Sequence, residues 1–205
     1  MSVTKRLAAL LLAAALSACA GRGPVAPTTP ATPWADRLAA LDQIGDWSLQ
    51  GRLGLTGGGK AASGSVSWRQ RSDGFDLRLH GAFGRGAMRL TENAAGARLE
   101  RADEPPIEAS SAAVLLADAL PDTPLPVASL RYWVLGRPAP GTPVDAQQLD
   151  SDNRLALLRQ NGWEIRYLEY QPVPPWVLPA KLQARKGDVE LRLAIERWTP
   201  GGHAP

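Results

Sequence analysis

Few side chains in this sequence are of the types that catalyse reactions or bind metals. The chain has two histidines, His80 and His203, and a single cysteine, Cys19. They lie far apart, and no spacing typical of a zinc site or of a nucleophile with its base is present. Several acidic residues occupy outward positions of expected strands: Asp76, Glu164, Glu190 and Glu196. A solvated surface explains them better than an acid/base pair, so we expect no enzyme and no metal or other cofactor.

Residues 54–61 come close to the phosphate-binding loop G-x-x-x-x-G-K-[ST]. Ala61 stands where that motif needs a hydroxyl for Mg²⁺, and the following residues alternate like a strand. The motif requires a helix at this point, because the helix N-terminus must meet the phosphate. We therefore interpret residues 57–59, three glycines, as the tip of a hairpin.

The lone cysteine follows a short apolar segment at the start of the chain. Lys5 and Arg6 precede about ten apolar residues, too few to span a bilayer. The segment ends in Leu-Ser-Ala-Cys at Cys19, which resembles the bacterial lipobox, and Ala20 follows. In proteins of that type the chain is cut before the cysteine, which carries diacylglycerol and an N-acyl chain. The alternatives are a small buried hydrophobe or a free thiol.

Lipidation at Cys19 would hold the protein to a membrane without a spanning helix, since two or more chains anchor stably. The absence of Asp at position 20 implies, by resemblance, the outer membrane. Residues 21–33 are rich in Pro, Thr and Ala. Extended at about 3.1 Å per residue, this tether reaches roughly 40 Å; alternatively it is a tail without a mechanical role. The whole chain has a net charge of +3, and removal of Lys5 and Arg6 with the signal peptide would bring the mature chain close to neutral. No basic stripe suggests that the protein binds nucleic acid.

The rest of the chain is dominated by a two-residue period. Apolar and polar residues alternate clearly from Trp47, from Phe75, from Trp163 and from Val189, while Trp198 falls one step out of phase. Such alternation predicts half-buried strands in an antiparallel sheet. Turn-forming residues separate the runs at 72–74, 94–96 and 186–188.

Three segments have helical signals instead: residues 33–43, 110–120 and 126–136. Serines begin the second, which Pro121 stops, and the third has Pro near its start and Gly136 at its end. We expect a mainly β fold, in which one curved sheet wraps over these helices.

Two aromatic features remain to be explained. The chain has seven Trp but only two Phe, and the inward-facing Trp residues either form an ordinary core or line a cavity for acyl chains. Phe83 lies in a glycine-rich segment between two strands, with Gly84 beside it. It either folds back over the rim of the sheet or projects as an apolar finger that touches lipid or a partner.

Several segments together resemble the LolB family of outer-membrane lipoprotein receptors. They are residues 47–53, 67–70, 77–84, 125–138, 158–170, 178–182 and 195–198. Each is weak alone, but their order and spacing are specific, and the lipobox is an independent feature. The related carrier LolA shares the fold but is soluble. The lipobox cysteine, Cys19, therefore favours the receptor over the carrier.

The resemblance implies an incomplete antiparallel β-barrel of about 11 strands, with about three helices as a lid over a hydrophobic cavity. Such a receptor, anchored in the outer membrane and facing the periplasm, would accept acylated lipoproteins from a LolA-like carrier and place them in outer-membrane lipid. The family's protruding loop carries Leu in a Pro-Leu-Gly segment; Phe83 takes that position, and Ala82 replaces the Pro. The expected cavity-lining residues are Trp47, Leu49, Trp68, Leu77, Leu79, Trp133, Trp163, Ile165, Leu191 and Leu193.

The expected organisation is a signal peptide at 1–18, a lipidated N-terminus and tether at 19–33, one monomeric half-barrel domain at 34–199 and a tail at 200–205. Two other functions stay open. One is a scaffold or binding lipoprotein whose filled interior takes no acyl cargo. The other is a lipid hydrolase, for which no nucleophile and base are found.

Overall fold

The computed structural model describes residues 31–81, 86–119 and 125–201. These residues form three helices, α2 (Trp34–Asp42), α3 (Ala112–Ala119) and α4 (Val127–Trp133), each slightly shorter than expected. They also form eleven strands: β1 (Trp47–Gly57), β2 (Lys60–Arg71), β3 (Gly74–Gly81), β4 (Met88–Asn93), β5 (Gly96–Arg101), β6 (Glu104–Ala109), β7 (Val144–Leu149), β8 (Leu155–Gln160), β9 (Trp163–Val173), β10 (Trp176–Lys186) and β11 (Val189–Pro200). No helix in these ranges is long and apolar enough to cross a membrane.

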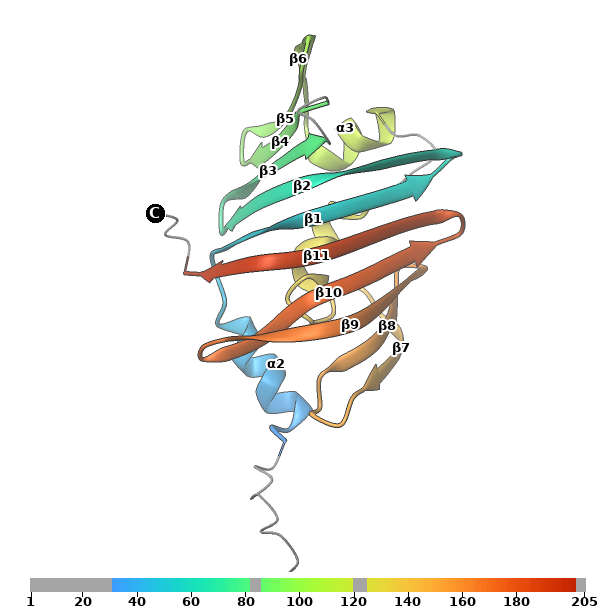
Figure 1. Cartoon of the computed structure of the whole chain (residues 1–205). Helices are drawn as coiled ribbons and strands as arrows, with labels where there is room; N and C mark the ends of the chain where they lie inside the picture. The colour runs from blue at the N-terminus through green and yellow to red at the C-terminus, as the bar shows by residue number, and fades with distance from the viewer. Residues whose placement is uncertain (1–30, 82–85, 120–124, 202–205) are drawn as a thin grey trace, which may run out of the picture. The chain divides into compact units, whose positions relative to one another are not determined.

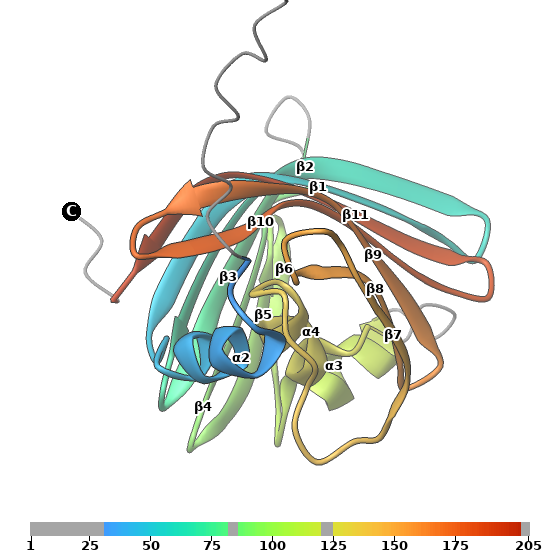
Figure 2. The same cartoon turned by 90° about the horizontal axis from the view of Figure 1, so that it is seen from below.

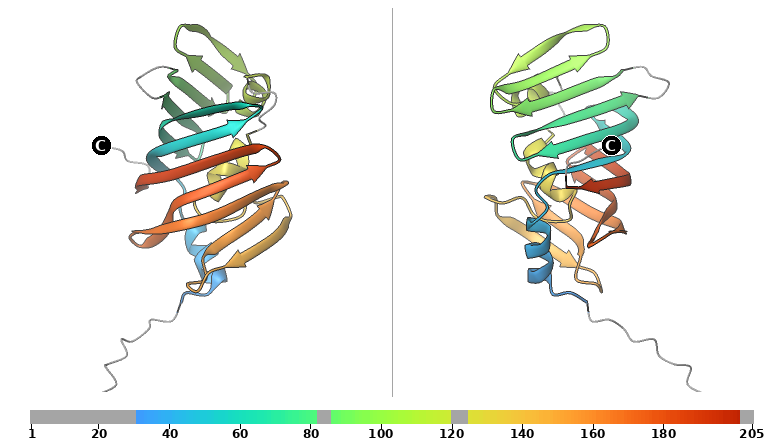
Figure 3. Two further views of the ribbon diagram at one scale, coloured as in Figure 1. Left: turned by 45° about the vertical axis from the view of Figure 1, so that its right-hand side comes forward. Right: turned by 90° about the vertical axis from the view of Figure 1, so that its left-hand side faces the viewer.

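All eleven strands belong to one antiparallel sheet in the order β6-β5-β4-β3-β2-β1-β11-β10-β9-β8-β7 (Figure 1). Chain neighbours pair as hairpins in two blocks, β1–β6 and β7–β11, and the pairing of β1 with β11 joins the blocks at the centre. Strands β6 and β7 lie at opposite edges and do not meet (Figure 3). The expected incomplete antiparallel barrel is therefore confirmed.

The sheet curves, and the three helices lie on its concave side (Figure 2). The alternating pattern explains this arrangement, because it places one apolar side chain in two on the concave face. Helix α4 is the most enclosed of the three helices: Val127, Leu130 and Trp133 are all buried. The core is thus a single layer of apolar side chains between the sheet and its helices.

The phase shift at Trp198 comes from a β-bulge. Strand β1 pairs with β11 in regular register until Gln50 faces Arg197 and Gly51 faces Ile195, so the extra residue lies on β11. Two consecutive exposed residues there return Trp198 to the concave face. The backbones approach so closely that a Cβ on Gly51 would lie 2.0 Å from the carbonyl oxygen of Ala194, which explains the glycine.

The near-match to a phosphate-binding loop is a hairpin, as expected. Residues 54–57 belong to β1, Gly58 and Gly59 form the turn with positive φ angles of 55° and 72°, and β2 begins at Lys60. Glycine adopts such angles without steric cost. No helix begins here to receive a phosphate.

Each helix is fixed to the sheet by polar contacts at its ends or flanks. On α2, Arg37 donates to the carbonyl of Val177 at 2.5 Å, and the indole of Trp176 donates to the carbonyl of Ala40 at 3.1 Å. The first N–H of α3, at Ala112, donates to the Glu92 carboxylate at 2.5 Å. That carboxylate satisfies a helix donor that has no partner within the helix.

Candidate functional site

An apolar cavity of about 80 Å³ lies between the sheet and helices α3 and α4. Its walls come from β1–β4, β11, α3, α4 and the residues beside α4, and every lining side chain is apolar except for the indole N–H of Trp68. The lining residues are Leu49, Leu53, Leu55, Val66, Trp68, Leu77, Leu79, Met88, Leu90, Leu116, Leu125, Val127, Leu130, Val134, Leu191 and Leu193. Such a lining favours hydrocarbon over a polar substrate.

Six of the ten residues expected to line a cavity do so: Leu49, Trp68, Leu77, Leu79, Leu191 and Leu193. The structure places the other four, Trp47, Trp133, Trp163 and Ile165, in the buried core outside this cavity. They lie on inward positions as expected, so the alternation located the concave face but not the extent of the hollow in it.

Tryptophans form a packed wall at one end of the cavity. The Trp47 ring lies 5.2 Å from Trp68 and 5.5 Å from Trp198, and Phe75 lies 6.2 Å from Trp68, all in tilted or edge-on contacts. Such aromatic pairs contribute about 0.5–1.5 kcal/mol each beyond the area that they bury. Of these rings, Trp68 alone borders the cavity, so most of the Trp residues stiffen the wall and do not line the site.

Sequence reasoning expected the helices as a lid over the cavity but missed the helix residues that line it. Leu116 on α3 and Leu125, Val127, Leu130 and Val134 on or beside α4 line it from the side opposite the sheet. Residues 127, 130 and 134 recur at spacings of three and four, which is the signature of one helix face. This spacing is the sequence signal that could have identified them as cavity-lining residues.

Sequence reasoning also missed the residue that fixes the end of α4. The Gln160 side chain, fully buried, accepts from the Trp133 indole at 2.8 Å and from the Ala139 amide at 2.9 Å. It donates to the carbonyls of Ala139 at 2.8 Å and Thr142 at 2.9 Å. The Tyr167 hydroxyl adds a bond of 3.0 Å to the Trp133 carbonyl. The C-terminal end of α4 is thereby attached to β8 and β9.

Phe83, Gly84 and Cys19 lie outside the described residues. The flanks of the segment that carries Phe83 are described. Leu79, near the end of β3, and Met88, at the start of β4, both line the cavity. The described strand ends on either side of this segment therefore lie beside the cavity.

None of the described residues that line the cavity is an acid or a base, and ordinary contacts account for the perturbed pKa values elsewhere. Burial disfavours the charged form of Asp76, but hydrogen bonds from Arg89 and Arg78 outweigh burial and lower its pKa. Burial raises the pKa of Tyr167 and Tyr170. Among the described residues no group of three or more His, Cys, Asp or Glu side chains could hold a metal ion.

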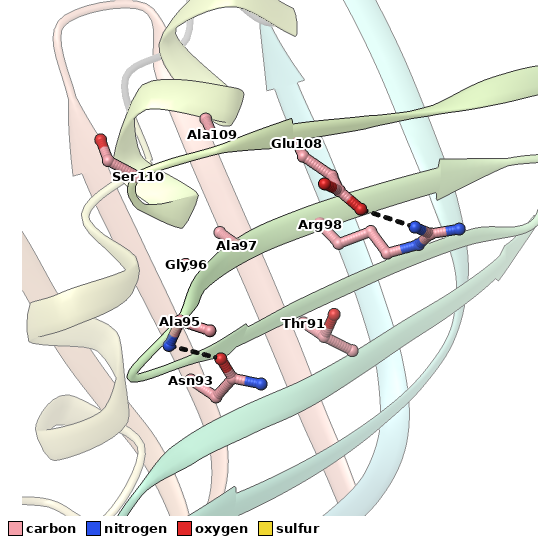
Figure 4. A pocket seen from close by; sticks show the side chains of 9 residues that line it. All are labelled: Thr91, Asn93, Ala95, Gly96, Ala97, Arg98, Glu108, Ala109 and Ser110. Carbon is pink, nitrogen blue, oxygen red and sulfur yellow. Dashed lines mark hydrogen bonds and ion pairs between the residues drawn. The ribbon is translucent and has the colours of Figure 1, made fainter.

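A larger hollow, of about 490 Å³, lies over β4, β5 and β6 (Figure 4). It is open and polar. Its cation, Arg98, is neutralised by Glu108 at 2.7 Å and Glu100 at 2.9 Å. Because Arg98 is exposed and its strand neighbours Ala97 and Leu99 are buried, the Arg98 side chain points away from the core. We take the smaller apolar cavity as the candidate site, because its lining selects one class of ligand.

Comparison with known proteins agrees with this geometry. The family model described as outer membrane lipoprotein LolB matches residues 45–198, which include nearly the whole sheet. The chain belongs to the LolB family. The outer-membrane lipoprotein LolB of Nitrosococcus oceani is 40% identical over 88% of this chain and 89% of its own length. That of Stutzerimonas stutzeri is 36% identical over 98% of both chains.

A solved structure of low sequence identity shares the fold. The crystal structure of a LolA superfamily protein from Nitrosomonas europaea matches with a TM-score of 0.50 at 10% identity, over 85% of this chain and 96% of that chain. At this identity the match shows the fold alone, and it agrees with the architecture that the resemblance to LolB and LolA implied.

Proposed function

We propose that this protein is an outer-membrane lipoprotein receptor, which takes lipoproteins from a periplasmic LolA-like carrier and inserts them into the outer membrane. The observation that carries the proposal is the apolar cavity under the helices of a LolB-family chain. It would bind the acyl chains of the cargo. We propose no catalysis and no cofactor apart from the protein's own covalent lipid.

The physical task is to keep acyl chains out of water between two proteins and a bilayer. Exposing about 40 CH₂ groups costs on the order of 30 kcal/mol, at ~0.8 kcal/mol each. An apolar cavity removes most of this cost. Transfer without nucleotide hydrolysis must then run downhill, so the receptor's cavity holds the chains more tightly than the carrier does and less tightly than the membrane does.

The cavity must enlarge to accept cargo. Its volume is about 80 Å³, whereas pockets that hold even drug-sized ligands have roughly 300–1,000 Å³. Leu116 on α3 and Leu130 on α4 close it from the helix side. We propose that these helices move away from the sheet, and that the end of α4 bound to Gln160 stays in place as the pivot.

Cys19 would carry the lipid that anchors the protein on the periplasmic face of the outer membrane, after removal of residues 1–18. Residues 19–33 would then link the anchor to the domain at 34–199. The family match lies within that range, and β11 extends to Pro200. The closely matching relatives are named outer-membrane lipoproteins, which supports this location. We propose that the receptor works as a monomer.

Phe83, with Gly84 beside it, would contact the bilayer or loosen the bound chains at delivery. The position of the flanking strand ends beside the cavity supports this role. The other side chains proposed to contact acyl chains are the six expected lining residues that border the cavity. Trp47, Trp133, Trp163 and Ile165 would support the wall from behind.

One observation favours a second function. A cavity of about 80 Å³ is close to filled, as expected for a scaffold lipoprotein that takes no acyl cargo. The two functions differ in whether the helices open.

The experiment mixes the mature chain, with Cys19→Ala, and a LolA-like carrier loaded with a fluorescently labelled lipoprotein. A receptor would take up the label without nucleotide, and the carrier would be left empty. Label that stays on the carrier, while the chain keeps its native circular dichroism spectrum, would refute the receptor function and favour the scaffold.

A further inference from the structure

The outer face of the sheet, which points away from the helices, carries a surplus of positive charge. On the eight neighbouring strands β8–β11 and β1–β4, ten Arg or Lys side chains but five Asp or Glu side chains point outward from the body of a strand. The cations are Arg52, Arg69, Arg78, Arg89, Arg159, Arg166, Lys181, Arg185, Arg192 and Arg197, and the carboxylates are Asp76, Glu164, Glu169, Glu190 and Glu196. The described residues as a whole carry nineteen basic and nineteen acidic side chains, so an acidic surplus elsewhere offsets that of the outer face.

The ion pairs of the outer face do not remove this surplus. Asp76, Glu164 and Glu190 each pair with two arginines. Arg69 and Arg197 pair with no carboxylate among the described residues. Towards the edge, β5 and β6 add one outward cation and two outward carboxylates, so the surplus belongs to the middle of the sheet. A surface with such an excess attracts anions.

An exposed leucine lies near the centre of the outer face. Leu168 on β9 is 60% exposed, because a register shift against β10 turns two consecutive residues, Leu168 and Glu169, outward. It borders an open hollow of about 440 Å³, which Arg52, Lys181 and Arg192 also line. Strands β1 and β11, which carry two of these cations, are the sixth and seventh of the eleven strands in the sheet order.

The curvature of the sheet makes this centre the part of the outer face that a flat surface reaches first. The helices lie on the concave side, so the outer face is convex (Figure 2). A protein partner would have to be both concave and acidic to cover it. A bilayer with anionic phospholipids is a continuous negative surface, which attracts Lys and Arg and accepts an inserted apolar side chain. Charge and shape therefore favour a lipid surface as the partner.

We infer that the outer face rests on a membrane that contains anionic phospholipids. Leu168 inserts between the headgroups, and Arg52, Lys181 and Arg192 lie against the lipid phosphates. In this orientation the helices and the acyl cavity face away from the bilayer, on the side from which a soluble carrier arrives (Figure 2). The contact goes beyond the proposed receptor function and does not depend on it, because it involves neither the cavity nor the cargo.

The test measures binding of the mature chain, with Cys19→Ala, to vesicles by sedimentation at low salt. The vesicles contain phosphatidylglycerol mixed with phosphatidylcholine, or phosphatidylcholine alone. The variant Arg52→Gln/Arg192→Gln removes two outer-face cations that are 82% and 70% exposed. Its matched control, Arg131→Gln/Lys186→Gln, removes two exposed cations from α4 and from the end of β10. Both variants change the net charge equally, and urea midpoints near that of the wild type establish that both are folded.

A second pair of variants tests the inserted leucine. Leu168→Ser removes the apolar side chain from the outer face, and Val114→Ser removes one that is 51% exposed on α3, on the opposite side of the sheet. We expect Leu168→Ser to bind the mixed vesicles at least threefold more weakly, because its side chain no longer enters the bilayer, and Val114→Ser to change less than twofold. A loss in Val114→Ser alone would place the helix side against the bilayer and refute the proposed orientation.

Each basic residue near an anionic membrane strengthens binding about fivefold. We therefore expect Arg52→Gln/Arg192→Gln to bind the mixed vesicles at least tenfold more weakly, and its control to change less than threefold. Vesicles of phosphatidylcholine alone should bind the wild type at least tenfold more weakly than the mixed vesicles. Absence of binding to the mixed vesicles, or equal losses in the two double variants, would overturn the proposal. Slower cargo uptake from a loaded carrier by Arg52→Gln/Arg192→Gln, without vesicle binding by the wild type, would assign the outer face to a protein partner and refute the lipid.

Discussion

Replacement of Gln160 by Leu should destabilise the protein strongly, although the two side chains are similar in size. Gln160 is fully buried and makes four hydrogen bonds of 2.8–2.9 Å, to Trp133, twice to Ala139 and to Thr142. Leucine fills a similar volume but leaves two donors and two acceptors buried without partners. Each such group costs about 1–3 kcal/mol. The lower end of that range gives a loss of about 4 kcal/mol.

Urea denaturation followed by Trp fluorescence measures this loss. With a slope near ~2 kcal/mol per M, a loss of about 4 kcal/mol lowers the midpoint by roughly 2 M at unchanged slope. Gln148→Leu is the matched control, because Gln148 is an exposed residue of β7, and its midpoint should stay within ~0.3 M of the wild type. Equal midpoints for the two variants would refute the argument that Gln160 fixes the end of α4.

Three further predictions follow from other contacts. Gly51→Ala should abolish soluble expression, because its Cβ would meet a carbonyl oxygen of β11 at 2.0 Å, whereas Gly54→Ala, with 4.0 Å to the nearest atom, should express normally; equal yields would contradict this. The lowered pKa of Asp76 means stability that is present above the unfolded pKa, ~3.9, and lost as pH falls through the folded pKa. The urea midpoint of Asp76→Asn should therefore lie below that of the wild type at pH 7 and approach it near pH 3, and a constant gap would exclude this linkage. The Phe83→Glu variant should fold and take up cargo normally but deliver it to liposomes more slowly, whereas Phe83→Leu should deliver it normally. Delivery by Phe83→Glu at the wild-type rate would refute the proposal that Phe83 acts as an apolar finger.

The fold was predictable because its main determinant, the two-residue period, is local. Alternation around Trp47, Phe75, Trp163 and Val189 placed strands and their inward faces correctly, and glycine or serine residues marked the turns. The shift at Trp198 was visible in the sequence, but its cause was not, because a bulge depends on which strand pairs with β11. That partner, β1, comes near the start of the domain's sequence, whereas β11 comes at its end.

The site was predictable only in part, for the same reason. Inward positions on strands were found, but the boundary of the cavity depends on where the helices pack. Trp133 and Trp163 pack against each other at 6.3 Å instead of lining the hollow. Gln160 has no local signature, because its four partners come from α4 and the segment after it.

The central claim is that acyl chains enter the cavity between the sheet and α4. A photoactivatable side chain at position 130, which lines the cavity, tests it most directly during transfer from a loaded carrier. The matched probe is at position 128, an exposed residue of the same helix. The account predicts crosslinks to the acyl chains of the lipoprotein from position 130 and not from position 128. Crosslinks from 128 alone, or from neither while the label still moves, would contradict it.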